Sequence, residues 1–183
     1  MVASEPDKVT QGNAGVGGTA HLAGVLFQKI TGTRFQFVPY RGGGAQAMQD
    51  LIAGNIDLMF ESPSICLPQV RAGSIKAYAV TAKNRLASAP DIPTVDEAGL
   101  PGFYTSNWLA LFAPKATSKE VIIKLSSAAA DALADPLVRQ RLINLEFEIP
   151  PRDQQTPEFL SAFQKAEIEK WWPIIKGANI KIE

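Results

Sequence analysis

The 183-residue sequence has little of what metal centres and nucleophilic active sites are built from. It contains one cysteine, Cys66, and one histidine, His21. A single cysteine excludes a disulfide within the chain and a cysteine-rich metal centre. Lysine plus arginine (18) balance aspartate plus glutamate (18), and no basic run occurs. This balance argues against a nucleic-acid partner.

Long hydrophobic runs are also missing. No apolar stretch approaches the length of a membrane span. The first residues, Met1 to Pro6, lack the basic-then-apolar pattern of a secretory signal, so we expect no signal peptide in this chain. The hydrophobic fraction of 46% and charged fraction of 20% are typical of a folded globular protein. The length suits one large domain or two small ones.

The first 113 residues alternate between strand and helix patterns. This alternation predicts an open, mainly parallel α/β sheet. We expect strands at 8–11, 35–38, 56–60, 75–81 and 106–113, with helices at 19–30, at 45–53, and from Ser62-Pro63 to about Gly73.

The C-terminal third has a helical texture. A capping box at Thr117 to Glu120 predicts a helix that runs to about Leu133. Asp135-Pro136 opens another helix to about Leu145, a short strand is expected at 147–149, and a last helix begins near Pro157. These helices have the pattern of a layer that covers a sheet.

Two glycine-rich loops stand where a strand passes into a helix: Gly12 to Thr19, and Arg41 to Gly44. The first N–H groups of a helix have no partner within it, and its dipole is positive at that end. Two such ends, placed side by side by a parallel sheet, predict a site for an anion, most simply a carboxylate.

Two other interpretations of the first loop remain open. Gly15-x-Gly17-x-x-Ala20 is a loose match to the dinucleotide fingerprint. The expected acidic residue after the second strand is missing, and Tyr40-Arg41 would instead suit the 2′-phosphate of NADP, as in an oxidoreductase. Alternatively, the glycines serve only to make a tight turn.

The candidate side chains have a structural and a functional interpretation each. Arg41 is expected either to pair with a carboxylate or to lie solvated at the surface. His21 either donates to a bound anion or has a structural role, whereas Cys66 is expected to be buried and inert. Glu61 and Ser62 follow the third strand, where open α/β sheets meet their ligands. No catalytic constellation such as G-x-S-x-G is present, so we expect no enzyme activity.

Longer motifs follow one another in a fixed order over nearly the whole chain. They are Gly18-Thr19-Ala20-His21-Leu22-Ala23-Gly24, Val38-Pro39-Tyr40-Arg41-Gly42-Gly43-Gly44, 50–60, 77–81, 91–102 and 108–114. Together they closely resemble the solute-binding proteins of tripartite tricarboxylate transporters, the Bug family. The resemblance implies a periplasmic protein without a cofactor that delivers small carboxylates to membrane permease subunits.

The resemblance also implies a periplasmic-binding-protein-like (type II) architecture. Residues 1–105 correspond to the second, ligand-cleft α/β lobe, and residues 106–183 to a crossover strand and C-terminal helices that complete the first lobe. The ligand contacts it implies are Asn13, Ala14, Gly15, Gly17, Gly18, Thr19 and His21 in the first loop, Tyr40, Arg41, Gly42 and Gly43 in the second, and Glu61, Ser62 and Ser64 after the third strand.

Family members are longer than this chain, which lacks the part that corresponds to most of the first lobe. Half a cleft is expected to bind weakly, because closure of two lobes buries the ligand. Helices that normally cover the missing sheet would expose their apolar faces, so we expect a homodimer or an exchange of C-terminal segments between chains. A fragment that only self-associates, without a ligand, is a further alternative.

Overall fold

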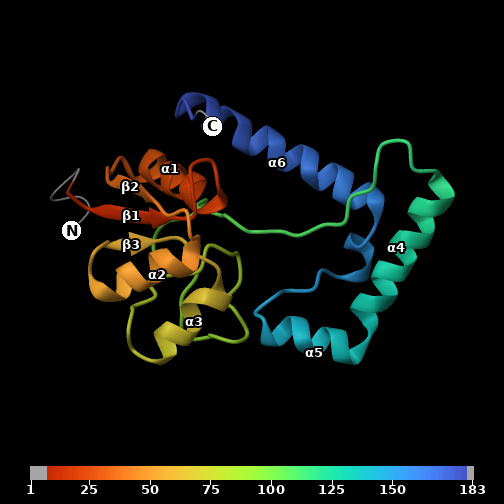
Figure 1. Cartoon of the computed structure of the whole chain (residues 1–183), viewed down its shortest axis with the longest axis horizontal. Helices are drawn as coiled ribbons and strands as arrows, with labels where there is room; N and C mark the ends of the chain where they lie inside the picture. The colour runs from red at the N-terminus through yellow and green to blue at the C-terminus, as the bar shows by residue number, and fades with distance from the viewer. Residues whose placement is uncertain (1–7, 181–183) are drawn as a thin grey trace. The chain divides into compact units, whose positions relative to one another are not determined.

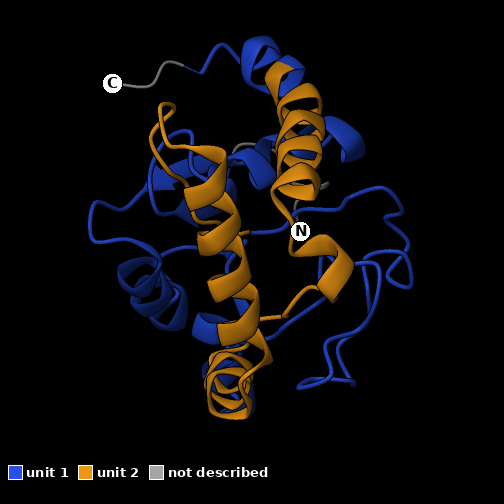
Figure 2. Ribbon diagram, turned by 90° about the vertical axis from the view of Figure 1, so that its right-hand side faces the viewer, with its two compact units in different colours: residues 1–107, 173–183 blue, residues 108–172 orange. Residues whose placement is uncertain are grey.

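The computed structural model describes residues 8–180 (Figure 1). The chain divides into two compact units, which Figure 2 shows in different colours: residues up to 107 together with those from 173 onward, and residues 108–172. Along the chain the elements are β1 (Thr10–Asn13), α1 (Thr19–Thr31), β2 (Gln36–Pro39), α2 (Gly44–Ala53), β3 (Leu58–Met59), α3 (Pro63–Arg71), α4 (Lys119–Ala134), α5 (Pro136–Asn144), the 3₁₀ turn η1 (Arg152–Gln154) and α6 (Pro157–Gly177).

The first unit is built on a three-stranded parallel sheet with the order β2-β1-β3. Thr10 pairs with Gln36 and Asn13 with Pro39, so β1 and β2 end level with each other. β3 is shorter than the sequence predicts, because only its two residues pair with β1. The expected parallel α/β arrangement is confirmed, with β1 at its centre.

α1 and α2 cover opposite faces of this sheet. A Cβ added to Gly24 of α1 would stand 2.7 Å from Phe37 Cε1 and 3.0 Å from Gln11 Oε1. A Cβ added to Gly12, the next residue of β1, would stand 3.3 Å from Ala47 Cβ of α2. Successive residues of a strand point to opposite faces, so Gln11 faces α1 and Gly12 faces α2. After β1 the chain therefore passes to the α1 face of the sheet, and after β2 it passes to the α2 face.

Aromatic side chains form much of the core of this unit. Phe27 of α1 lies 5.6 Å from Phe60 and 5.5 Å from Phe103 between ring centroids. Phe60 and Phe103 are 5.4 Å apart in an edge-to-face arrangement, and Phe103 is fully buried. Such pairs add about 0.5–1.5 kcal/mol each beyond the area they bury. These contacts pack Phe60 and Phe103, which follow β3, against α1.

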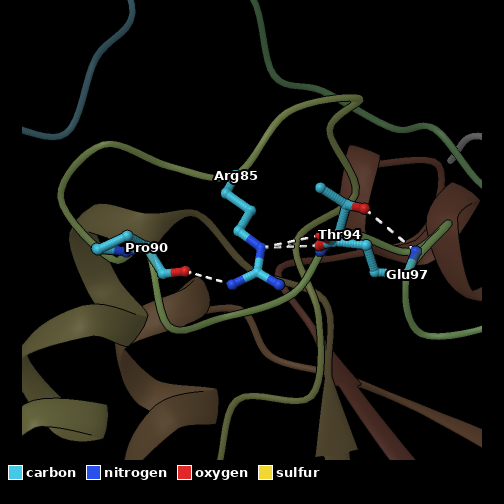
Figure 3. A network of polar contacts seen from close by, with 4 residues as sticks. All are labelled: Arg85, Pro90, Thr94 and Glu97. Carbon is cyan, nitrogen blue, oxygen red and sulfur yellow. Dashed lines mark hydrogen bonds and ion pairs between the residues drawn. The ribbon is translucent and has the colours of Figure 1, made fainter.

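The long connection between α3 and residue 105 is ordered by a polar network (Figure 3). Arg85 Nε donates to Glu97 Oε2 at 2.9 Å, and one Arg85 Nη group donates to the Pro90 carbonyl at 2.7 Å. Thr94 N–H donates to Glu97 at 2.8 Å, while Glu97 N–H donates to Thr94 Oγ1 at 3.3 Å. This reciprocal pair is a capping box on the turn at 94–98. Arg85 and the Thr94 amide hold the pKa of Glu97 at about 2.

Three expected strands do not form within the described residues. In 75–81 only Val80 makes a bridge, to Thr94. The segment 106–113 has no strand partner here, and its Leu109 and Leu111 are largely exposed. At 147–149 the chain instead closes the turn after α5, where Glu146 has a positive φ and Phe147 N–H donates to the Leu142 carbonyl. A strand needs a neighbour for its backbone groups, and these segments lack one.

The unit 108–172 is helical, as expected. α4 begins one residue later than the predicted capping box: Ser118, not Thr117, is the N-cap and accepts from Val121 N–H at 3.4 Å. Glu120 pairs instead with Lys124, one turn ahead. Asp135 caps α5 as predicted.

No helix in residues 8–180 is long and apolar enough to cross a membrane. The unit 108–172 nevertheless exposes many large apolar side chains. Among them are Leu109, Leu111, Phe112, Ile123, Leu125, Leu137, Ile143, Leu145, Ile168 and Trp172, each more than half exposed. Single exposed apolar residues are ordinary, but a set of this size in one small unit predicts a covered surface.

Candidate functional site

The carboxyl ends of β1 and β2 form the edge of the sheet where a ligand is expected. Asn13 and Pro39 end their strands side by side, and Tyr40 N–H donates to the Asn13 carbonyl at 2.8 Å. Beyond this point the chain turns toward α1 on one face and toward α2 on the other. Such a divergence between neighbouring parallel strands leaves a crevice outside their carboxyl ends. We call this region the carboxyl edge.

The first glycine loop, residues 14–18, is held by its own hydrogen bonds. Gly15 N–H donates to Asn13 Oδ1 at 3.0 Å, and Gly18 N–H donates to the Gly15 carbonyl at 3.3 Å. Gly17 N–H donates to His21 Nδ1 at 3.1 Å. Gly15 and Gly17 have φ values of 132° and 81°, which explains why glycine is needed at these two positions.

His21 is a structural part of this loop. Its ring is buried and lies edge-on to Phe37, with the centroids 4.5 Å apart. Because Nδ1 accepts from Gly17, the neutral ring carries its proton on Nε2. Burial lowers the pKa of His21, which favours this neutral form. His21 Nδ1 therefore has a structural role, and only Nε2–H and the backbone N–H of His21 remain as donors for an anion.

The second glycine loop, residues 40–43, is also closed by internal bonds. Gly43 N–H donates to the Tyr40 carbonyl and Gly42 N–H donates to Gln46 Oε1, both at 3.1 Å. The Tyr40 hydroxyl donates to Asp50 Oδ2 at 2.7 Å, so it is directed at α2. Burial and this carboxylate raise the pKa of Tyr40. Arg41 is exposed, in accord with the solvated alternative.

The first turns of α1 and α2 supply free donors at the carboxyl edge. The amides of Gly15, Gly17, Gly18, Gly42 and Gly43 have acceptors in their own loop or in the strand or helix next to it. At the two helix starts, six amides have no acceptor among the described residues: Thr19, Ala20 and His21 of α1, and Gly44, Ala45 and Gln46 of α2. Each set stands at the positive end of a helix dipole. The glycine loops thus shape the edge, and the helix starts supply its donors.

A third group of predicted residues follows β3 and reaches the start of α2. Glu61 Oε1 accepts from Ser62 N–H at 2.8 Å and from Ser62 Oγ at 3.2 Å. The Ser62 and Ser64 hydroxyls are 3.2 Å apart. A Cβ added to Gly44 would collide with the Glu61 carboxylate, standing 2.8 Å from its Cδ. Glu61 therefore lies directly against the first residue of α2.

Two features of the edge were not predicted from the sequence. The Gly44 to Gln46 amides were not among the predicted contact residues, although the start of their helix was predicted as part of an anion site. The buried Asn13 carboxamide uses Oδ1 for Gly15, while its Nδ2 has no partner among the described residues. Asn13 was predicted as a ligand contact through its place in the loop, not through this unpaired donor.

Cys66 and metal-binding groups can be placed briefly. Burial, helped by the nearby Glu61 charge, raises the pKa of Cys66 to about 11. The thiol is therefore protonated at neutral pH, which agrees with the inert residue predicted for this position, although Cys66 is only partly buried and not buried as expected. Within residues 8–180, no cluster of three or more histidine, cysteine or acidic side chains is arranged to hold a metal ion.

A pocket of about 230 Å³ is formed by residues of the unit 108–172. Its two arginines are already engaged, since Arg152 pairs with Asp131 and Arg139 donates to the Leu133 carbonyl. Its wall is formed by Ala130, Leu133, Ala134, Arg139, Ile149, Pro150, Pro151, Arg152 and Gln155. Because both arginines are already bound within the protein, this pocket has fewer free hydrogen-bond donors for an anion than the carboxyl edge has.

Comparison with known proteins places this geometry in a family. A UPF0065 protein from Agrobacterium vitis, encoded in the TAR-I ttuE-ttuC' intergenic region, is 42% identical over 179 residues. The match covers 98% of this chain and 51% of the relative. The chain thus spans about half the length of the curated relatives it matches.

Solved structures give the same result. The periplasmic binding protein BugD superposes with a TM-score of 0.84 at 35% identity, covering 100% of this chain and 60% of BugD. MatC from Rhodopseudomonas palustris with bound malate also gives 0.84, at 33% identity, with 95% of this chain and 59% of MatC covered. R. palustris Rpa4515 with adipate gives 0.84 at 29% identity, with 98% and 58% covered.

These matches confirm the resemblance seen in the motifs and the periplasmic-binding-protein fold class. The dinucleotide interpretation and the ligand contacts of individual residues are not tested by them. The family model described as "Tripartite tricarboxylate transporter family receptor" (TctC) matches residues 1–180. This chain therefore belongs to the tripartite tricarboxylate transporter receptor family.

Proposed function

We propose that this chain binds a small organic carboxylate at the carboxyl edge, as an extracytoplasmic solute-binding protein or a part of one. The observation that carries the proposal is the set of six unpaired amides on two helix starts beside the level ends of β1 and β2. In this role the protein lies in the periplasm and delivers its ligand to the permease subunits of a tripartite tricarboxylate transporter. It binds and releases its ligand unchanged, without catalysis or a cofactor.

A carboxylate suits this edge better than other small ligands do. It accepts several hydrogen bonds at once, and its charge is favoured at helix N-termini. A hydrogen bond to a charged group contributes about 1.5–3 kcal/mol. The malate and adipate complexes of the two R. palustris relatives support this class of ligand.

The predicted contact residues divide into two roles in this proposal. The backbone of Thr19 and His21 donates to the ligand, whereas Gly15, Gly17, Gly18, Gly42 and Gly43 shape the loops. Ala14, Arg41, Tyr40, Asn13 and the Glu61, Ser62 and Ser64 group line the approach. We propose that residues 1–105 supply this lobe and residues 106–183 the return to a second lobe.

The test removes one donor without disturbing the helix. Thr19 is the first residue of α1, and Gly18 before it is extended, with φ −70° and ψ 165°. Proline is tolerated at this position and after such a residue, so Thr19→Pro deletes one amide hydrogen from an intact helix. Lys119→Pro is the matched control, because Lys119 begins α4 after Ser118 in a similar conformation.

Isothermal titration with malate and adipate is expected to show binding to the wild-type chain. We expect Thr19→Pro to weaken it about tenfold or more and Lys119→Pro to leave it unchanged. Equal affinities in all three proteins would contradict the proposed site. NADPH is titrated in parallel, since tight NADPH binding with no carboxylate binding would favour the dinucleotide interpretation of the first loop.

We also propose that the exposed apolar side chains of residues 108–172 are covered by a second copy of the chain, through dimerisation or segment exchange. Support comes from the number of large apolar residues that this unit exposes. Size-exclusion chromatography with light scattering is expected to give twice the mass of one chain at micromolar concentration. A monomer under these conditions would contradict this second proposal, and no thermal shift with any carboxylate would leave self-association as the better account of the chain.

A further inference from the structure

Glu61 brings a negative charge to an edge that otherwise attracts anions. It stands two residues after β3 and lies against Gly44, the first residue of α2. Its half-buried carboxylate therefore lies beside the start of α2, on the side where a side chain of residue 44 would stand. A ligand carboxylate that approaches the start of α2 would therefore meet this negative charge.

The two oxygens of Glu61 are engaged differently. Oε1 accepts from both the amide and the hydroxyl of Ser62. Oε2 points at Gly44 and has no hydrogen-bond donor among the described residues. Glu61 also has no cationic partner within that part of the chain. A carboxylate oxygen accepts two hydrogen bonds, so Oε2 has capacity for a donor from outside the protein.

Gly44 makes this placement of Glu61 possible. Any residue larger than glycine at position 44 would put its Cβ within 2.8 Å of Glu61 Cδ and displace the carboxylate. Gly44 has no positive φ, so glycine is not needed there for the backbone conformation. The missing side chain instead gives room for Glu61 beside the helix start.

We propose that Glu61 is a specificity-determining residue that favours carboxylates with a hydrogen-bond donor on the adjacent carbon. This inference rests on the proposed function. The ligand carboxylate binds the α1 amides, and its ammonium or hydroxyl group donates to Glu61 Oε2. A plain dicarboxylate gains no such bond and is repelled by the Glu61 charge. An ammonium group gains most, because it brings the opposite charge to a half-buried carboxylate.

Succinate, malate and aspartate test this directly, because they share one four-carbon frame and differ at one carbon in carrying hydrogen, hydroxyl or ammonium. Isothermal titration of the wild-type chain is expected to rank aspartate above malate and malate above succinate. A bond to a charged group corresponds to about a tenfold to hundredfold preference for aspartate over succinate.

Glu61→Gln keeps an acceptor for Ser62 and removes the charge. We expect it to bring the aspartate-to-succinate ratio within about threefold of unity, without weakening succinate. Gly44→Ala, which displaces Glu61, is expected to act in the same direction. Glu148→Gln, which removes an exposed charge in the other unit, is the control and should keep the wild-type ratio. Circular dichroism melts check that each variant is folded.

The outcomes separate this inference from the proposed function. If Glu61→Gln binds all three acids with the wild-type ratios, the carboxylate site stands and the role of Glu61 is refuted. A wild-type preference for succinate would refute it as well. If neither protein binds any of the three acids, the proposed function fails, and the inference fails with it.

Discussion

Replacing His21 by phenylalanine should loosen the first glycine loop and remove a pH dependence of stability. The ring keeps its contact with Phe37, but Gly17 N–H loses its acceptor. A lost hydrogen bond with one group left unpaired costs about 1–3 kcal/mol. Gly17 is only partly buried, so water can replace part of the bond and the lower end of this range is expected.

The pH dependence follows from the direction of the His21 pKa shift. Burial lowers the pKa of the folded state below the ordinary value of 6.5. Below pH 6.5 the unfolded chain takes up a proton that the folded chain refuses, because a protonated Nδ1 would face the Gly17 N–H. Stability therefore falls as the pH drops from about 6.5 toward the folded pKa, by at most about 1.4 kcal/mol per pH unit.

Urea unfolding followed by tryptophan fluorescence measures both effects. His21 is the single histidine, so the window from pH 6.5 to pH 5 isolates it from most carboxylates. We expect the free energy of unfolding to decline through this window in the wild type and to stay nearly level in His21→Phe. His21→Asn, whose Oδ1 accepts without titrating, should recover part of the stability but not the slope. The same slope in all three proteins would refute the assignment of this bond.

Three further predictions concern other parts of the first unit. Gly24→Ala places a Cβ 2.7 Å from Phe37 Cε1 and should lower the free energy of unfolding by about 1–3 kcal/mol in chemical denaturation. Gly177→Ala is the control, because nothing lies within 4 Å of its added Cβ, and it should be neutral or stabilising; equal losses of stability in both variants would contradict the close packing of α1. Glu97 has a pKa lowered to about 2, so its contribution to stability is complete above about pH 4.5 and is lost as the pH falls toward 2. Glu97→Gln should lack this part of the acid unfolding transition, and an unchanged acid unfolding curve would argue against the network in Figure 3. Cys66, with a pKa raised to about 11, should react with a thiol reagent at pH 8 far more slowly in the folded chain than in denaturant, and equal rates would show that its thiol is not protected.

The helices could be predicted from the sequence because their signals are local. α1 and α2 end before Gly32 and Gly54, which have φ values of 67° and 76° and close each helix as expected. Asp135 was correctly predicted as a cap for α5. The cap of α4 was misplaced by one residue because Thr117 and Ser118 are both good N-cap residues, and local sequence does not choose between them.

The strands were harder to predict because pairing depends on distant neighbours. The pattern at 106–113 is that of a buried strand, yet its side chains are largely exposed in this chain. A strand pattern states only that a segment suits a sheet, and not that a partner strand is present. For the same reason 75–81 was predicted as a strand and forms one bridge.

The two strand-to-helix turns and the free amides of the helix starts after them could be predicted from the sequence. Glycine density correctly indicated the turns after β1 and β2. The amides of Gly17 and Gly42 are instead bound by His21 and Gln46, side chains of the following helices, and the sequence does not predict these two bonds. Glu61 and Gly44 are 17 positions apart in the sequence, so no local sequence pattern predicts their contact.

The central claim is that an organic anion binds at the helix starts beside the ends of β1 and β2. A ¹⁵N NMR titration of the labelled chain with malate tests it most directly, because each backbone amide reports separately. The account predicts that the largest shifts fall on Thr19, Ala20 and His21, together with Gly44, Ala45 and Gln46. Largest shifts within residues 108–172, or no shifts at millimolar malate, would contradict it.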